Sequence, residues 1–201
     1  MTEFTFILVT FWAPLVVPWL LVLVVAGAYF FRRAFLPFVV RITGVLYVLV
    51  VAAQTFAQYL VWSGDSLSSK LLPPHQSILY FLKYAGVHFW LAPLIALIVA
   101  LAFYTILRAL KDKNARFFEE GEVELGALAA FLVGWPRVIV FLPIVFLAVV
   151  SISGIKMALR KNAYTTLGIP FLIGLTVALA CGYTILQTLR LESLAIIPGV
   201  R

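Results

Sequence analysis

The residues of this chain that are best suited to chemistry are its carboxylates, and there are few of them. The 201-residue sequence holds eight acids. They are Glu3, Asp65, Asp112, Glu119, Glu120, Glu122, Glu124 and Glu192. Two carboxylates can activate a water molecule for hydrolysis when one acts as the base and the other holds a proton. Any such pair in this protein must come from these eight residues.

Glu122 and Glu124 are the best placed of these acids, because they lead directly into the apolar run Leu125–Pro136. An acid at the entrance to a membrane helix is costly, and it is therefore a candidate for function. The alternative is a structural role, since acids in the first turn of a helix offset its dipole without any further duty. Both interpretations remain open on the sequence pattern.

The other reactive side chains form no constellation typical of a catalytic or metal site. His75 and His88 are 13 residues apart and lack the i, i+4 spacing of a zinc site on a helix, so interfacial packing is favoured. Cys181 is the only cysteine, which excludes an internal disulfide or a zinc ribbon. The sequence contains no phosphate loop, nucleophile elbow or dinucleotide fingerprint. We expect neither a metal nor another cofactor.

The composition indicates which elements must position these acids. Hydrophobic residues make up 64% of the chain and charged residues 11%, with a mean hydropathy of +1.11. Soluble domains carry about 25% charged residues, so the composition excludes such a domain and indicates a chain embedded in a lipid bilayer. The long apolar runs do not alternate as the strands of a membrane barrel do, and the predicted class is therefore all-α.

Charged residues divide the chain into apolar runs that reach or approach the ~20 residues of a membrane helix. The runs are Phe4–Phe31, Ile42–Gly64, Tyr84–Leu107, Leu125–Pro136, Val138–Ile155 and Asn162–Leu189. The fourth run would extend only about 18 Å, which is short of the ~30 Å hydrocarbon core. We predict a single integral membrane domain over residues 1–201, with about six transmembrane helices, one of them short.

The basic residues favour this layout. If the short run crosses the membrane, ten basic residues share one side and five lie on the other, as the positive-inside rule expects. The ten are Arg32, Arg33, Arg41, Arg108, Lys111, Lys113, Arg116, Lys156, Arg160 and Lys161. The five are Lys70, Lys83, Arg137, Arg190 and Arg201. We therefore predict a multi-pass protein of the inner or plasma membrane with both termini outside.

The same layout bears on partners. The net charge of +7 is spread over loops between apolar runs, so it predicts cytoplasmic membrane loops and no nucleic-acid partner. No charged residue is expected in the middle of a span, which disfavours a dedicated ion path. The bilayer is the predicted partner, and the sequence leaves the oligomeric state open.

The stretch around Glu122 resembles the C-terminal half of the prepilin peptidases, membrane aspartic endopeptidases that cleave leader peptides from pilin-like substrates. That family's pattern reads Gly-x-Gly-Asp-x-Lys-Leu, then Gly-Trp nine residues later, and a Pro-Phe-Gly-Pro-Phe turn before the last span. The matching residues here are Gly121, Leu125, Gly134, Trp135, Pro170 and Phe171. The resemblance covers residues 117–189.

The resemblance implies a role for each site residue. Glu122 stands at the position of the family's catalytic aspartate and would be the base. Asp65 precedes Leu71-Leu72-Pro73-Pro74, which is similar to the family's Leu-Leu-Pro-Asp turn although one residue out of register, and it would hold the proton. Glu124, at the position of the family's lysine, would be an acid beside that pair. The wall of the site would consist of Gly121, Gly168, Pro170 and Phe171.

Two functional interpretations follow. The first is an aspartic-type endopeptidase that cleaves pilin-like leader-peptide helices at the cytoplasmic face of the membrane. The second is a catalytically inactive relative or a non-enzymatic subunit of a membrane complex. A glutamate in place of the aspartate moves the carboxylate by about 1.5 Å, and a misplacement of that order can cost ~100-fold in rate. The six-span layout also separates Asp65 from Glu122, unless residues 76–107 fold as a hairpin of two short spans.

Overall fold

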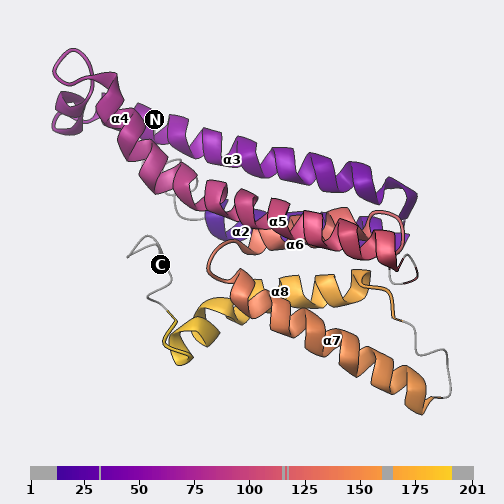
Figure 1. Cartoon of the computed structure of the whole chain (residues 1–201). Coiled ribbons are helices and arrows are strands. Elements are labelled where there is room, and N and C mark those ends of the chain that lie inside the picture. Colours follow the sequence, from indigo (N-terminus) through magenta and orange to yellow (C-terminus); the bar gives the residue numbers. More distant parts are fainter. Residues whose placement is uncertain (1–12, 32, 115, 117, 160–164, 192–201) are drawn as a thin grey trace.

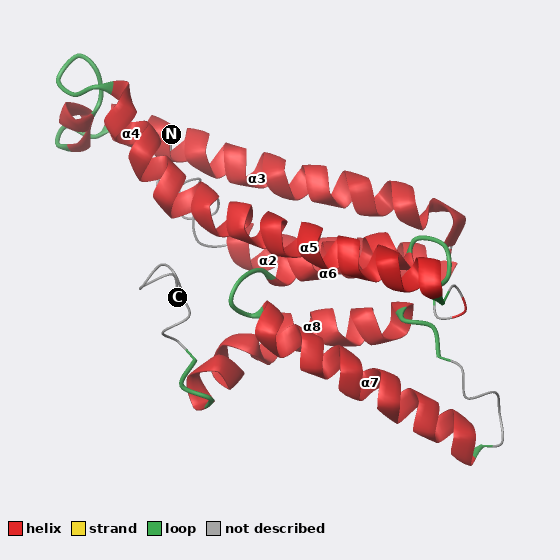
Figure 2. Ribbon diagram, in the orientation of Figure 1, coloured by secondary structure: helices red, strands yellow, loops and turns green. Residues whose placement is uncertain are grey.

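The computed structural model describes residues 13–31, 33–114, 116, 118–159 and 165–191. These residues form helices joined by short loops, with no strand among them, which confirms the predicted all-α class (Figure 2). In chain order the helices are α2 (Ala13–Phe31), η2 (Arg33–Phe35), α3 (Leu36–Gly64), η3 (Ser68–Leu71), α4 (Ile78–Ala85), η4 (Gly86–Trp90), α5 (Leu91–Lys113), α6 (Glu122–Val133), α7 (Val138–Ala158) and α8 (Gly168–Thr188).

Four helical segments of the described chain are long and apolar enough to cross a membrane. They are Arg33–Gly64, Ile78–Lys113, Val138–Ala158 and Gly168–Thr188, and a shorter apolar helix covers Val16–Phe31. Large apolar side chains such as Leu23, Leu49, Ile98 and Phe146 are exposed on these helices, which is the surface expected of helices that face lipid. The predicted total of about six spans stays a prediction, because α6 has 12 residues and α2 is described only from Ala13 onward.

Residues 78–113 form one continuous helix that consists of α4, η4 and α5. The wider π-helical turn η4 lies just before Pro93, whose ring nitrogen has no hydrogen to donate to the preceding turn. The local widening absorbs the proline, and the helix continues without reversing. The hairpin over residues 76–107, which would have brought Asp65 toward Glu122, is therefore absent.

The short helix α6 is the most enclosed element of the bundle. It packs against α5 and α8, with α3 and α7 also in contact, and nearly all of its side chains are buried. A helix that is apolar on every side is expected to be buried in this way. Gly126 permits the close packing, since a Cβ there would lie 2.6 Å from Leu107 and 2.8 Å from Phe171.

The helix termini gather at two ends of the bundle, and one of them carries most of the described basic residues. Helices α2, α5 and α7 finish, and α3, α6 and α8 begin, on the right in Figure 1. We call this the basic end. The described basic residues there are Arg33, Arg41, Arg108, Lys111, Lys113, Arg116 and Lys156. The opposite end, on the left, holds the turn after α3 and the start of α4.

Candidate functional site

Glu122 is the first residue of α6, and its side chain is completely buried, with 0% of its surface exposed. Its carboxylate accepts a hydrogen bond from the Tyr29 hydroxyl at 3.3 Å. It also accepts from two backbone N–H groups, that of Glu119 at 3.1 Å and that of Leu167 at 3.2 Å. A buried carboxylate requires such donors, because an unpaired charge in apolar surroundings is very costly.

The Glu122 carboxylate lies against the N-terminus of α8. Leu167 is the N-cap residue of that helix, so its N–H group belongs to the set that has no acceptor within the helix. The positive end of the helix dipole also favours a negative charge at this position. Gly168 makes the approach feasible, since a Cβ there would lie 2.5 Å from Glu122 Oε1 and closer still to the ring of Tyr29.

A second carboxylate strengthens the same contact. The Glu119 side chain forms an ion pair with Arg33, while the Glu119 backbone N–H donates to Glu122. The Arg33 guanidinium also lies over the ring of Tyr29, 4.8 Å from its centroid. We call this network of Tyr29, Arg33, Glu119, Glu122 and the Leu167–Gly168 backbone the Glu122 junction. It ties α2, η2, α6 and α8 together at the basic end.

Asp65 has a very different environment. It is the C-cap residue of α3 and is exposed. Its carboxylate accepts hydrogen bonds from the hydroxyl of Ser68 at 2.7 Å and from the Ser68 backbone N–H at 3.0 Å. These hydrogen bonds favour the ionised form and lower the pKa of the Asp65 carboxyl below its ordinary value. Asp65 thus fixes its own turn and contacts no other helix through these bonds.

The structure does not bring the predicted pair together. Asp65 follows the last residue of α3, whereas a Cβ at Gly121, the residue before Glu122, would lie 3.1 Å from Leu36 at the first residue of α3. The 29 residues of α3 rise about 43 Å, so the two acids lie near opposite ends of this long helix, whose course Figure 1 shows. Carboxyls that share a proton must lie within about one water molecule of each other.

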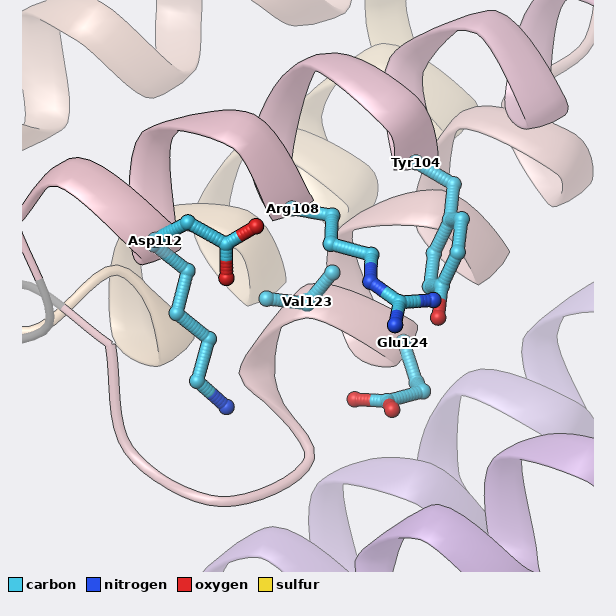
Figure 3. Close-up of a pocket in the computed structure, with 6 residues that line it drawn as sticks. Tyr104, Arg108, Asp112, Val123 and Glu124 are labelled. Atoms are coloured by element: carbon cyan, nitrogen blue, oxygen red, sulfur yellow. The ribbon is translucent and has the colours of Figure 1, made fainter.

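Glu124 was expected beside the predicted pair of acids, but its side chain lies on a different side of α6 from that of Glu122. Residues two apart on a helix point to nearly opposite sides, because each residue turns the chain by about 100°. Glu122 therefore points toward α2 and α8, and Glu124 points toward α5. There it lines a groove of about 330 Å³ together with Val123. The α5 residues of this groove are Tyr104, Arg108, Lys111 and Asp112 (Figure 3).

The four residues predicted to form the wall of the site occupy two different places. Gly121 and Gly168 adjoin Glu122, the first through a left-handed backbone (φ 80°) that favours glycine, the second through close approach. Pro170 and Phe171 are buried in the first turn of α8. The Phe171 ring contacts the rings of Phe103 and Phe141 at centroid distances of 6.1 and 6.4 Å. These two residues belong to the apolar core.

Arg137 is the charged residue that separates the short apolar run from the next one. It lies in the turn between α6 and α7, beside Gly182, where a Cβ would be 3.3 Å from the arginine side chain. Tyr47 of α3 is close enough to interact with it electrostatically. Because α6 is too short to reach the far end of the bundle, Arg137 lies within the length of α3 and α8. Among the described residues it forms no ion pair.

Within the part of the chain that the structure describes, no three or more His, Cys, Asp or Glu residues gather as metal ligands. His88 instead stacks on Tyr84, with ring centroids 4.0 Å apart.

No protein-family model matches this chain, and no curated protein or solved structure matches it. What the protein does must therefore be inferred from its own residues and their geometry.

Proposed function

We propose that this chain is a non-enzymatic subunit of a membrane complex, and that residues 117–189, whose sequence pattern resembles the prepilin peptidases, do not carry out that family's chemistry. The observation that carries the proposal is the burial of Glu122. A general base needs a free lone pair within hydrogen-bond reach of a water or substrate proton. Three protein donors occupy the Glu122 oxygens, and the side chain has no exposed surface through which a water or substrate could reach the remaining lone pair.

The positions of the other acids support the same proposal. A two-carboxylate mechanism needs a second acid that is free to hold a proton beside the first. Asp65 lies at the far end of α3, and the nearby Glu119 is engaged by the Arg33 guanidinium. Neither residue is available as the partner of Glu122 in this arrangement.

Arg137 is the feature that favours a role in assembly. A charge within the apolar length of a membrane protein is costly, and it is retained where it pairs with another charge or with a water-filled cavity. Arg137 is half-buried and has no acidic partner among the residues that the structure describes. A partner helix that carries an acid at this depth would satisfy it.

The first experiment measures leader cleavage. Membranes that contain the wild-type chain and a substrate with a pilin-type leader peptide are followed by gel shift, together with membranes carrying Glu122→Gln and the exposed neighbour variant Glu120→Gln. We expect no cleavage above background in any of them, because Glu122 is not accessible. Size-exclusion chromatography shows whether all three proteins are folded. If they are, cleavage by the wild type and by Glu120→Gln that is lost in Glu122→Gln would contradict the proposal.

The second experiment tests assembly. Native electrophoresis of detergent extracts should place the wild-type chain in a complex larger than its own 22.3 kDa. Arg137→Gln should release the chain from that complex, whereas Arg190→Gln, which removes an exposed arginine after α8, should not. Equal complex sizes for the two variants would show that Arg137 is not part of the interface. A monomeric wild-type chain would overturn the proposed assembly role.

The endopeptidase remains the second candidate, and one observation favours it. Glu122 is the buried charged residue of the described core, and it occupies the position of the family's catalytic aspartate. This function would require opening of the Glu122 junction and a rearrangement of the continuous helix 78–113 to bring Asp65 closer. The cleavage experiment above separates the two candidates, since only the endopeptidase predicts cleavage that depends on Glu122.

A further inference from the structure

The groove between α5 and α6 contains four charged side chains of both signs. Arg108, Lys111 and Asp112 come from the last turns of α5, and Glu124 comes from the first turn of α6 (Figure 3). Among the described residues, none of these charges forms an ion pair within 4 Å. The groove therefore offers two cations and two carboxylates whose charges are not neutralised by one another at contact distance.

An exposed apolar surface continues from this groove along α5. Leu97 and Leu101 lie seven and three residues before Tyr104, so they share its face of the helix, and they are 43% and 56% exposed. The charged end of this surface belongs to the basic end of the bundle, and the apolar part extends along a segment long enough to cross a membrane. A charged groove that continues into an apolar stripe matches a phospholipid, which has a charged headgroup attached to apolar acyl chains.

We infer that this groove binds the headgroup of a zwitterionic aminophospholipid, with phosphatidylethanolamine as the chemical type. The phosphate would lie between Arg108 and Lys111, which are the residue types that bind phosphate oxygens. The primary ammonium would donate hydrogen bonds to Asp112 and Glu124, and one acyl chain would follow Leu101 and Leu97. An anionic lipid satisfies only the two cations and meets repulsion from the two carboxylates.

The charge pattern also selects among zwitterionic lipids. The trimethylammonium group of phosphatidylcholine has no N–H to donate, so it cannot form hydrogen bonds with the carboxylates of Asp112 and Glu124. Free phosphoethanolamine shares the headgroup chemistry but has no chain to bury on α5. Lipid and soluble headgroup can therefore be distinguished by experiment.

Native mass spectrometry of the purified chain in detergent tests this inference. Phosphatidylethanolamine, phosphatidylglycerol and phosphatidylcholine with identical acyl chains are added in equal amounts, and the bound fraction of each is measured. Since an exposed charge contact typically contributes up to 1 kcal/mol, we expect about fivefold more bound phosphatidylethanolamine than either competitor. Millimolar free phosphoethanolamine should not displace the lipid.

Matched variants identify the groove as the site. Glu124→Gln should reduce the bound phosphatidylethanolamine to the level of phosphatidylglycerol, and Arg108→Gln should lower the binding of all three lipids. The controls are Glu120→Gln and Lys113→Gln, which remove exposed charges at the same end but outside the groove, and they should bind as the wild type does. Equal binding of phosphatidylglycerol, displacement by the free headgroup, or an unchanged Glu124→Gln variant would overturn the inference.

Discussion

Glu122 and Asp65 are both carboxylates at helix termini, and the bundle uses them in opposite ways. Glu122 receives donors from α2, from the loop before α6 and from the N-terminus of α8. Asp65 receives its donors from Ser68, three residues away in the same turn, and its side chain faces solvent. The first joins segments that are far apart in sequence, and the second shapes a local turn.

This contrast shows that the environment of a carboxylate decides what it can do. The Glu122 carboxylate is expensive to bury, so its removal disturbs every segment that satisfies it. The Asp65 carboxylate remains hydrated, so its hydrogen bonds replace bonds to water with little net gain. The prepilin peptidase pattern assigns the two acids to one dyad, but the geometry gives them separate structural surroundings.

Of the variants that test this contrast, Glu122→Ala should cause the largest loss of unfolding free energy. It leaves the Tyr29 hydroxyl and the N–H groups of Glu119 and Leu167 without an acceptor in a buried place. Each unsatisfied donor costs about 1–3 kcal/mol, so we expect a loss of about 4 kcal/mol in unfolding free energy. Unfolding in mixed micelles measures the loss. Glu120→Ala, an exposed neighbour, should change the stability by less than about 0.5 kcal/mol. Similar values for the two variants would mean that the junction does not stabilise the fold.

The variant Gly168→Ala tests the same junction without removing a charge. The added methyl group would meet Glu122 Oε1 and the ring of Tyr29, and overpacking of this kind costs about 1–3 kcal/mol. The matched control is Gly154→Ala on α7, where no atom lies within 4 Å of the added carbon. Thermal unfolding followed by size-exclusion chromatography should show a lower midpoint for Gly168→Ala alone. Combined with Glu122→Ala, its effect should be smaller than the sum, because the two residues share one site.

Changes to Asp65, in the turn after α3, should have the smallest effect on stability. The direction of its pH dependence follows from the pKa of Asp65. The folded-state pKa of Asp65 is below its ordinary value, so its contribution to stability is fully present above about pH 4 and is lost as the pH falls through the folded pKa. Asp65→Asn should remove this part of the acid dependence. Melting midpoints between pH 6 and pH 3 measure it, with Ser68→Ala as a partial variant that keeps the backbone donor. A large loss at neutral pH in Asp65→Asn would contradict a purely local role.

Much of the helical layout follows from the sequence alone. The apolar runs beginning at Ile42, Tyr84, Val138 and Asn162 each overlap a long apolar helix of the structure. The short run before Pro136 corresponds to α6, a short helix bounded by two glycines with positive φ. These features depend on local composition and on backbone preferences of single residues, and both can be read along the chain.

The partners of each acid could not be read in the same way. Tyr29 precedes Glu122 by 93 residues and sits at the end of an apolar run, where a tyrosine is ordinary. Leu167 contributes a backbone N–H, which no side-chain pattern reveals. The spacing of the groove residues on α5 shows from the sequence that they share one face of the helix. That this face lies beside Glu124 depends on how α6 packs against α5, which the spacing does not reveal.

The sequence by itself predicted an all-α chain of long apolar helices, which the described residues confirm, and it showed that few acids are available for any carboxylate chemistry. The transfer free energy of apolar runs depends on composition, so no knowledge of packing was needed for that conclusion. Only the tertiary structure decided that Glu122 is enclosed by its own protein, that Asp65 lies at the far end of α3, and that Arg137 falls within the bundle. Those outcomes depend on contacts between segments distant in sequence, which the continuous helix 78–113 and the short helix α6 bring into place.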